Sequence, residues 1–596
     1  MPEIVSDEVQ ARMLIDGTIS MYSDSYIYSL PKYAFANCGE LLSVSLPNVS
    51  TIESNCFMQC SKLSQFDFTG VCSVGQNAFQ SCAFVSVDLK SAECVWEDGC
   101  LKNNDKLKFV SWPVSSPTAT RFFYGCYALR SVYMPFANRF GQSVFAQCHN
   151  LRLEECVFSD ITALNSYALY SVYYLSSANF PSTSFIGSQA FGYCLGLLSA
   201  KFSIATYVGT SAFFYCLRLE SLDIPAATQI YSWAFATCRK LKEVSAPEVQ
   251  KVSDRAFISC CGLEMLSFPK ASWFCQSAIY SCYRFRALLI GGSSVASGSN
   301  SMFGYLSPVF SIYVPDSLVT NYKAANYWSN YASNIVGISA FSGVPSGLTI
   351  TDIADVSQYD KLMIDHLSDS TASFIASDKF GSCSAMLTAT LPAVGTVGYQ
   401  GFYGCCALES ASLLTATNIS SRAFNMCYNL ENFFAPNVQT IGEDAFASTA
   451  LRSVEFSVAE TINVRAFQYC SLLESVSLPV VSLIKSSVFA GCNMLSDVYL
   501  PNVETIKSSA FNSCYMLSEI NLPNVKSLGA CFRECRTLNK VILSGSSVAY
   551  LETSQIFYSS PNAMVYVPDS LVSAYKSANI WSYLSDRIFG HSEIPS

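Results

Sequence analysis

Short segments in which apolar and polar residues alternate recur along most of the chain. Residues 473–479 read Leu-Glu-Ser-Val-Ser-Leu-Pro, and residues 219–225 and 517–523 repeat the same plan. Alternation over four or more residues predicts a β-strand with one buried face. The proline follows the strand, where it removes no hydrogen bond from the interior of a sheet. The chain is therefore expected to contain many short strands of one kind.

A second pattern fixes the distance between these segments. The phrase Ala-Phe-x-x-Cys, first seen around Phe35 and Cys38, recurs with its Phe position stepped by 22 residues in most cases. An apolar residue such as Ile52 or Val74 lies five residues before that position. The position is filled in two series, by Phe35, Phe57, Phe79, Leu101, Phe123, Phe145, Leu169, Phe191, Phe213, Phe235, Phe257, Ile279 and Phe303, then by Phe380, Phe402, Phe424, Phe446, Phe467, Phe489, Phe511, Phe532 and Phe557.

A repeat this short predicts a stacked architecture. One unit of 22 residues cannot bury its apolar side alone, whereas stacked units cover one another. The two series predict 13 and 9 coils, about 22 in all. Parallel strands of successive coils lie about 4.8 Å apart, so the stack is on the order of 100 Å long. The expected fold class is a β-rich solenoid with a parallel sheet on one face and short helical caps.

The chain contains two copies of this plan. Residues 314–328 and 567–581 have nearly the same sequence, which begins Val-Pro-Asp-Ser-Leu-Val in both. The spacing of Leu318, Tyr322 and Ala325 predicts a helix, with Asp316 or Ser317 as its N-cap. A helix at the end of a stack would cover an open strand edge, which otherwise invites aggregation. We expect a first array over 1–344 with a cap at 314–336, and a second over 345–596 with a cap at 567–589.

Composition narrows the class of protein. Hydrophobic residues make up 51% of the chain and charged residues only 13%, about half the usual charged fraction. The mean hydropathy is +0.28, yet no run of 18 apolar residues occurs, so no membrane insertion is expected. The net charge of −9 argues against a nucleic-acid partner. Residues 1–9 are acidic and have no apolar core, so no signal peptide is visible.

Cysteine is abundant, with 26 residues. Seventeen lie three residues after the Phe position, where Asn104 and Thr449 replace them in two coils. A position that accepts Cys, Asn or Thr is expected to be a small buried slot holding a free thiol. Scattered disulfides and a metal site remain open as alternatives. Adjacent pairs such as Cys260 and Cys261 suit one tetrahedral ion poorly, so no metal and no cofactor are expected. A chain rich in free thiols also favours folding in a reducing cytoplasm.

Other candidate chemistry is sparse. Outward carboxylates could in principle serve a polysaccharide hydrolase, but they are spread over distant coils, and the adjacent Glu154 and Glu155 would point to opposite faces of a strand. No catalytic residue is assigned, and we expect no enzyme. The histidines His149, His366 and His591 are isolated and are expected on the surface or in loops. Several tyrosines outside the repeat columns are expected to pack between coils, with recognition as the alternative: Tyr22, Tyr26, Tyr28, Tyr173 and Tyr174.

The repeat resembles that of the BspA-type leucine-rich repeat family. Its unit is similar to "IgxxAFxxCxxLxxVxLPxxvxx", and the tail "YVPDSLVxxYKxxNxWSxYxxxI" looks like a terminal module of such proteins in gut bacteria and their phages. The resemblance implies a solenoid with a sheet along one face, and its characterised members are surface adhesins that bind host proteins or other cells. The family shares no catalytic residues. The units at Leu101, Leu169 and Phe303 depart from the pattern because they lack the Cys three residues after the Phe position.

These observations predict a non-enzymatic recognition or adhesion protein. Its partner would be a cell-surface glycan or protein, its location extracellular, and homo-oligomers remain open. One alternative is a phage virion fibre or receptor-binding component with virion partners, since such a protein needs no leader. A polysaccharide hydrolase is the weaker alternative. The binding face is expected at the outward strand positions, namely Ser43, Ser45, Asp67, Ser221, Asp223, Glu243, Ser245, Ser475, Ser477, Asp497 and Glu519.

Overall fold

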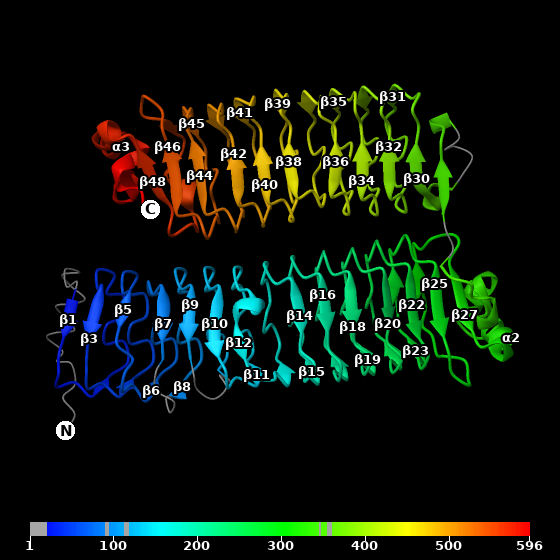
Figure 1. The fold of residues 1–596 in the computed structure, drawn as a ribbon, viewed down its shortest axis with the longest axis horizontal. Coiled ribbons are helices and arrows are strands. Elements are labelled where there is room, and N and C mark those ends of the chain that lie inside the picture. The colour runs from blue at the N-terminus through cyan, green and yellow to red at the C-terminus, as the bar shows by residue number, and fades with distance from the viewer. Residues whose placement is uncertain (1–20, 90–94, 113–118, 345–346, 355–359, 596) are drawn as a thin grey trace. The chain divides into compact units, whose positions relative to one another are not determined.

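The computed structural model describes residues 21–89, 95–112, 119–344, 347–354 and 360–595. It is a parallel β-solenoid, which confirms the fold class expected from the repeat (Figure 1). The chain forms two compact units, whose boundary in the sequence falls between Val344 and Pro345. Each unit has its own continuous hydrophobic core.

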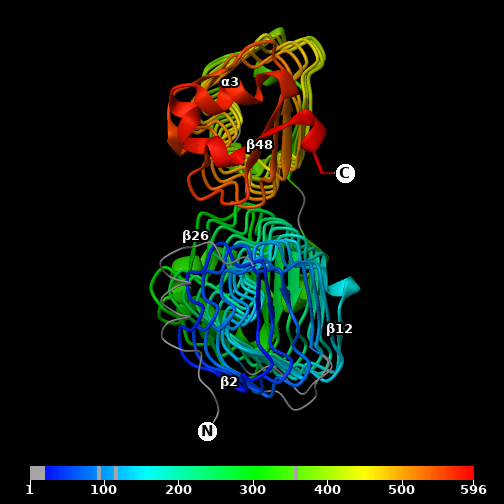
Figure 2. The ribbon, with the colours of Figure 1, turned by 90° about the vertical axis from the view of Figure 1, so that its left-hand side faces the viewer.

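Each typical coil contributes one strand to a first sheet and a shorter strand to a second sheet. Pairing is parallel and runs from coil to coil, so Ser43 lies beside Gln65 in the first sheet and Thr51 beside Ser73 in the second. Both pairs are one repeat apart, which is why residues of one repeat position form straight columns. Figure 2 looks along the stacks, where the coils of each unit superpose as a closed outline around its core.

The strands of unit 1 are short and regular. The first sheet contains β1 (Met21–Ser23), β3 (Ser43–Ser45), β5 (Gln65–Phe66), β7 (Ser86–Asp88), β9 (Phe109–Ser111), β10 (Ser131–Met134), β12 (Val157–Phe158), β14 (Ser177–Asn179), β16 (Ser199–Lys201), β18 (Ser221–Asp223), β20 (Glu243–Ser245), β22 (Met265–Phe268), β25 (Ala287–Ile290), β27 (Ser311–Val314) and β28 (Ile335–Gly337). The second sheet contains β2 (Ser29–Leu30), β4 (Thr51–Ile52), β6 (Ser73–Val74), β8 (Val95–Trp96), β11 (Arg139–Phe140), β13 (Ala163–Leu164), β15 (Phe185–Ile186), β17 (Tyr207–Val208), β19 (Gln229–Ile230), β21 (Lys251–Val252) and β23 (Trp273–Phe274). A further pair is β24 (Ile279–Tyr280) with β26 (Phe303–Gly304).

Unit 2 repeats this arrangement. Its first sheet contains β29 (Leu348–Ile350), β30 (Ile364–Ser368), β32 (Thr388–Thr390), β34 (Ser410–Ser412), β36 (Asn432–Phe434), β38 (Ser453–Glu455), β40 (Ser475–Ser477), β42 (Asp497–Tyr499), β44 (Glu519–Leu522), β46 (Lys540–Leu543), β48 (Met564–Val567) and β49 (Ile588–Gly590). Its second sheet contains β31 (Phe374–Ile375), β33 (Thr396–Val397), β35 (Asn418–Ile419), β37 (Thr440–Ile441), β39 (Thr461–Ile462), β41 (Leu483–Ile484), β43 (Thr505–Ile506), β45 (Ser527–Leu528) and β47 (Tyr550–Leu551).

The remaining side of each coil, which we call the turn side, carries the Ala-Phe-x-x-Cys segment. It has two left-handed residues in most coils, for example Ser211 at φ 55° and Tyr215 at φ 64°. Between them the amide of Phe213 donates to the carbonyl of Ala234 in the next coil at 2.7 Å. These bonds between coils hold non-glycine residues in a conformation that L-amino acids otherwise avoid.

The Phe column forms the centre of the core. Phe424 stacks on Phe446 with ring centroids 5.4 Å apart and planes 1° from parallel, and Phe446 stacks on Phe467 in the same way. Column Phe side chains such as Phe424 are fully buried. The same stacking joins Phe191 and Phe213 in unit 1, at 5.0 Å. Burying this series supplies the main apolar contribution to stability.

The cysteine column lies directly behind the Phe column. Cys216 is buried, and its Sγ donates to the carbonyl of Phe191 in the preceding coil at 3.1 Å. Asn104 fills the same slot, and its Nδ2 donates to the carbonyl of Phe79 at 2.9 Å. Every cysteine in the described part of the chain is free. The slot is therefore small and buried, as its residue types predict, and both Cys216 and Asn104 donate a hydrogen bond from it.

The caps cover the ends of the stacks but are less helical than expected. The cap of unit 1 runs through η2 (Asp316–Leu318), α2 (Val319–Ala324), η3 (Trp328–Asn334) and η4 (Ile338–Ala340), and that of unit 2 through η8 (Asp569–Leu571), α3 (Val572–Ser577), η9 (Ile580–Arg587) and η10 (His591–Glu593). The remaining 3₁₀ turns are η1 (Leu153–Glu155), η6 (Lys361–Met363) and η7 (Ser554–Phe557).

Aromatic side chains fix each cap to the last coils. Trp328 donates from Nε1 to the carbonyl of Ala296 at 2.7 Å, while the hydroxyl of Tyr322 accepts from the amide of Ala296 at 3.0 Å. The expected N-cap role of Asp316 and Ser317 is wrong, since Leu318 occupies that position. The carboxylate of Asp316 instead accepts from the Ser339 hydroxyl at 2.8 Å and braces the chain after β28.

Candidate functional site

The eleven residues expected on the binding face occupy outward positions of the first sheet. In β20 the pattern is clear, because Glu243 and Ser245 are exposed on either side of the buried Val244. The same alternation places the others in their strands or, for Asp67, directly after one. Unit 1 holds Ser43, Ser45, Asp67, Ser221, Asp223, Glu243 and Ser245, and unit 2 holds Ser475, Ser477, Asp497 and Glu519.

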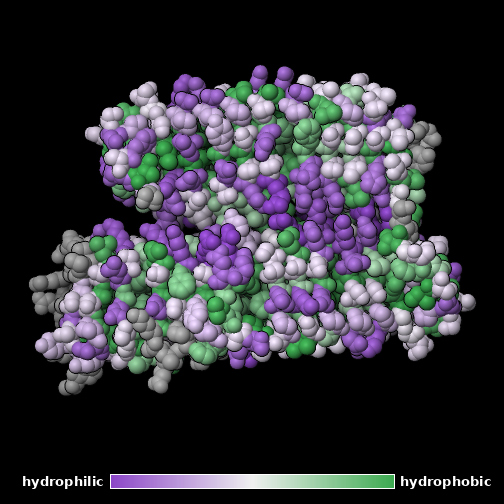
Figure 3. Space-filling model, in the orientation of Figure 1, coloured by the Kyte–Doolittle hydropathy of each residue, from purple (hydrophilic) through white to green (hydrophobic). Residues whose placement is uncertain are grey.

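Register aligns these side chains into columns along each unit. Ser477 lies between Glu455 and Tyr499, which are its partners in the neighbouring strands. Asp223 lies beside Lys201, with 3.8 Å between a carboxylate oxygen and Nζ. In Figure 3 hydrophilic, intermediate and hydrophobic side chains are interspersed over the visible surface of each unit. The surface is therefore mixed, and some of its charges are paired.

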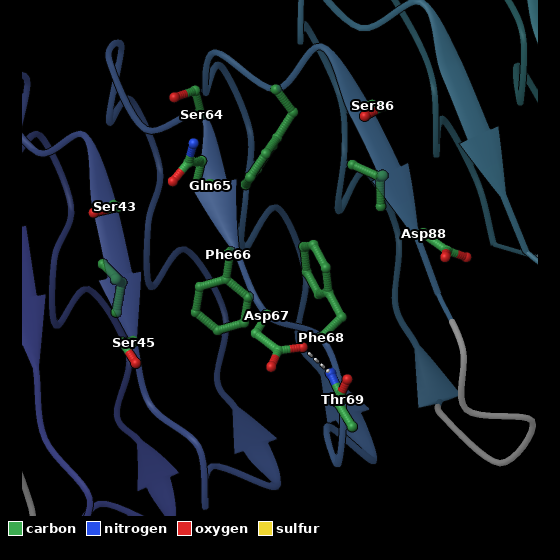
Figure 4. A pocket seen from close by; sticks show the side chains of 13 residues that line it. Ser43, Ser45, Ser64, Gln65, Phe66, Asp67, Phe68, Thr69, Ser86 and Asp88 are labelled. Carbon is green, nitrogen blue, oxygen red and sulfur yellow. Dashed lines mark hydrogen bonds between the residues drawn. The ribbon is translucent and has the colours of Figure 1, made fainter.

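A hollow of about 560 Å³ interrupts this face over β3, β5 and β7. Figure 4 shows Ser43, Ser45, Asp67, Ser86 and Asp88 around it. Its walls therefore include three residues of the expected face together with two that the sequence reasoning did not select. The hollow brings Asp67 and Asp88 to one site, whereas the other expected carboxylates lie on distant coils.

The hollow has a local cause in the sequence. Strand β5 begins five residues after Cys60, but β7 begins only four residues after Cys82. The ladder β1-β3-β5 ends there, and the described strands continue as a separate ladder from β7 to β12. Unit 2 has the same shortening between Thr449 and β38, and its first sheet also divides before β38. The segment between Cys82 and β7, one residue shorter than its counterpart after Cys60, was the available signal for the hollow.

The polar groups of the hollow are mainly hydrogen-bond acceptors and hydroxyls. Oδ1 of Asp67 accepts from the Thr69 amide at 2.9 Å, which orients this carboxylate (Figure 4). Phe66 is half-buried and packs on Phe79, with ring centroids 5.0 Å apart, so the wall beside Asp67 is apolar and supported. Two carboxylates with serine hydroxyls suit a ligand rich in hydroxyl donors and disfavour an anion.

Groups that could have supported catalysis have structural partners. Glu154 and Glu155 lie in η1 rather than in a strand, contrary to the expectation. Arg130 donates to Glu155 through Nε at 2.6 Å and Nη2 at 2.7 Å, and this pairing lowers the pKa of Glu155. Within the described ranges no three His, Cys, Asp or Glu residues cluster as they would around a metal ion.

The histidine expectation is partly wrong. His149 is 1% exposed and lies between two tyrosines, 4.3 Å from the ring centroid of Tyr173 and 5.2 Å from that of Tyr127. It is therefore a core residue. His366 is part-buried and within 2.9 Å of the Thr388 hydroxyl, and His591 approaches the carbonyl of Leu543 at 3.1 Å.

The tyrosines outside the repeat columns divide into two groups. Tyr173 is buried and Tyr22 packs against the core, as expected for packing between coils, and Tyr174 is half-buried. Tyr26 and Tyr28 are exposed by 71% and 52%, so packing between coils is wrong for them. They lie in the first described coil of the stack. Few described residues lie on the side of this coil that faces away from the rest of the stack.

No helix in the described part of the chain is long and apolar enough to cross a membrane. The curated proteins contain no match to this chain. Among solved structures, a leucine-rich repeat protein of Treponema pallidum shares 29% identity, covering 25% of this chain and 72% of that one, with a TM-score of 0.23. One from Bacteroides ovatus shares 17% identity over 84% and 87% of the two chains, at a TM-score of 0.19. A leucine-rich cell-surface protein of Faecalibacterium prausnitzii shares 15% over 81% and 88%, at 0.20.

The family comparison covers most of the sequence. The model of the BspA type leucine rich repeat region matches six times, over residues 28–152, 119–198, 162–286, 206–332, 358–474 and 460–582. These matches include both units and the beginnings of both caps. The repeat columns and the parallel coils seen in the structure agree with that assignment. The chain belongs to the BspA-type leucine-rich repeat family.

Proposed function

We propose that this protein is a non-enzymatic recognition or adhesion protein that binds a cell-surface glycan or protein through the outward face of the first sheet. The hollow over β3, β5 and β7 carries the proposal, because it is a concave, polar site on the face where the repeat aligns its variable residues. Membership of a leucine-rich repeat family supports a binding role. The proposed location is extracellular, at a bacterial cell surface.

The chemistry of the hollow favours a neutral saccharide as ligand. Its volume of about 560 Å³ lies within the range of small-molecule sites, roughly 300–1,000 Å³. Asp67 and Asp88 can accept hydrogen bonds from sugar hydroxyls, and the serines can donate or accept. Phe66 offers an apolar surface beside them. A negatively charged ligand would meet two carboxylates, so we expect neutral sugars to be preferred over acidic ones.

Titration calorimetry with neutral tetramers of mannose, glucose and N-acetylglucosamine tests this site. We expect at least one to bind the unchanged protein and to lose about tenfold or more in affinity with Ser45→Lys, which fills the hollow. The matched control is Thr51→Lys, at the outward position of the second-sheet strand that follows β3, which should bind normally. Absence of binding to all three tetramers, or binding unchanged by Ser45→Lys, would overturn the assignment of the hollow.

A further inference from the structure

A second concave site lies on the turn side of unit 1, away from the first sheet. Its volume is about 490 Å³, and its walls come from the coils of Leu101, Phe123, Phe145 and Leu169. We call it the tyrosine groove, because Tyr124, Tyr167 and Tyr170 line it. None of its residues belongs to the proposed binding face.

The groove arises from one repeat position. The residue after the Phe position is Tyr124 in one coil, Ala146 in the next and Tyr170 in the third. Adjacent coils are about 4.8 Å apart, so two coils separate the tyrosines by about 10 Å. Ala146 is buried and lines the site with a small side chain, so no third ring stands between the two tyrosines in this column.

Tyr170 is held firmly in this arrangement. A Cβ atom on Gly192 would lie 3.0 Å from its Cδ2, so the tyrosine ring occupies the space that this glycine leaves open. Tyr167 and Tyr193 each contact it with ring centroids 5.5 Å away. Burial raises the pKa of Tyr170 to about 12, so its hydroxyl remains neutral at physiological pH. The wall of the groove therefore exists before a ligand binds.

The charge of the groove is opposite to that of the chain as a whole. The chain has a net charge of −9, yet the charged residues that line the groove are Lys102 and Arg121, and no carboxylate lines it. Nζ of Lys102 lies 5.5 Å from the centre of the Tyr124 ring, and Arg121 is exposed. The amides of Gln142 and Gln147 add polar groups. Aromatic rings, amides and two cations are suited to a sugar ring that carries an acidic group.

We propose that the tyrosine groove binds an acidic saccharide, with the sugar ring against Tyr124 and Tyr170 and its carboxylate paired with Lys102 and Arg121. This is a site separate from the hollow of the first sheet. The two sites differ in the charge of their walls, since carboxylates line the hollow and cations line the groove. The hollow therefore disfavours acidic sugars, whereas the groove favours them. A protein with both would bind neutral and acidic parts of a glycan at different places on unit 1.

The probes for calorimetry are tetragalacturonate and sialyllactose, each with a neutral counterpart, fully methyl-esterified tetragalacturonate and lactose. We expect at least one acidic probe to bind and its neutral counterpart to bind about tenfold more weakly or not at all. Raising the salt to about 0.5 M should weaken binding, because the cations lie near the surface. No saturable binding of either acidic probe, or equal binding of the neutral counterpart, would overturn the proposal.

Matched variants test the location. Arg121→Asn is compared with Arg255→Asn, since both arginines occupy the same left-handed repeat position, at φ 57° and 55°, where Asn is tolerated. Tyr170→Ala is compared with Tyr280→Ala, which lies at the same repeat position outside the groove. Each groove variant should lose about tenfold in affinity, while its control binds normally and all four keep the circular dichroism spectrum of the unchanged protein. Acidic binding that survives both groove variants would place the site elsewhere and contradict the proposal.

Discussion

At the scale of single residues, the cysteine column explains how this chain keeps many thiols unreactive. The column thiols are buried, and each of those in Cys194, Cys216 and Cys238 donates to a backbone carbonyl at 3.1 Å. Burial raises the pKa of Cys60 and of Cys194 to about 12. A thiol held in its neutral form is a poor nucleophile. The column therefore acts as packing with one hydrogen bond per coil.

This raised pKa predicts how stability depends on pH. An unfolded thiol ionises near pH 9, whereas Cys60 and Cys194 remain protonated up to about pH 12 in the folded protein. A folded pKa above the unfolded value gives stability that is present below pH 9 and is lost as the pH rises from 9 towards 12. Each such thiol contributes a slope of about 1.4 kcal/mol per pH unit in that window.

Urea titrations at several pH values check this expectation. The midpoint should change little between about pH 7.5 and 8.5 and fall steeply above pH 9. Thiolate absorbance in the ultraviolet separates the cysteines from the tyrosines, and it should appear only as the protein unfolds. A midpoint that stays level to about pH 10.5, or thiolate absorbance from folded protein in that range, would show that the column thiols are not buried as described.

The residue scale also shows where sequence reasoning was limited. His149 looked isolated because its neighbours in the sequence are ordinary, but in a stack the relevant neighbours are one coil away. Tyr127 precedes it by 22 residues and Tyr173 follows it by 24. A comparison of equivalent positions in adjacent coils would have predicted the aromatic contacts. The same comparison would have found the alternation of Tyr124, Ala146 and Tyr170.

At the scale of elements, the caps show which features were predictable. The nearly identical sequences of residues 314–328 and 567–581 fall almost entirely within the cap of each unit. The extent of helix was overestimated, because Asp316 bonds to Ser339 instead of capping a helix, and α2 is only six residues long. The apolar pattern could not reveal a partner 23 residues away. What fixes the cap is a buried tryptophan rather than helix length.

Removal of that tryptophan should open the end of unit 2. Trp581 is 2% exposed, and its Nε1 donates to the carbonyl of Ala549 at 2.7 Å. We expect Trp581→Ala to destabilise the protein by about 3–5 kcal/mol, since it loses packing, a buried hydrogen bond and cover for the last coils. Trp581→Phe keeps most of the packing and should cost about 1–3 kcal/mol. Denaturant unfolding measures both.

Light scattering distinguishes a cap from an ordinary core position. An uncovered strand end should make Trp581→Ala associate as its concentration rises. The control is Phe467→Leu, a core substitution in the middle of unit 2 that lowers stability without uncovering an end. If Trp581→Ala associates no more than Phe467→Leu at the same concentrations, the cap serves stability alone.

The first sheet also shows which features the repeat period can predict. The period of 22 residues predicts parallel strands and columns because every regular coil is the same length. The hollow lies where the segment between Cys82 and β7 is one residue shorter than its counterpart after Cys60, and where one described ladder ends and the next begins. Periodicity describes what the coils share, so a site made by one irregular coil falls outside it. Irregular coils are therefore the positions to inspect in related sequences.

At the scale of the whole molecule, the chain is two capped solenoids that each present a long, mixed face. Each unit buries its own core, so nearest-neighbour contacts between coils set its stability. Substitutions on the outward positions should therefore affect binding far more than folding. The charge pair of Lys201 and Asp223 is exposed, and its loss should cost less than about 1 kcal/mol.

The most direct test of the account is cosedimentation of the purified protein with intact bacterial cells, before and after their surface glycan is stripped. The face variant carries lysine at Ser45, Ser221, Asp223, Glu243 and Ser245. The matched control carries lysine at outward positions of the second sheet, namely Thr51, Gln229, Thr440, Thr461 and Thr505.

The account predicts saturable binding by the unchanged protein and by the second-sheet control, and loss of binding by the face variant with little change in its melting temperature. Loss of binding after stripping would identify a glycan as the partner, and binding that persists would identify a surface protein. Undiminished binding by the face variant, or no saturable binding to any cell by the unchanged protein, would contradict recognition through the first sheet.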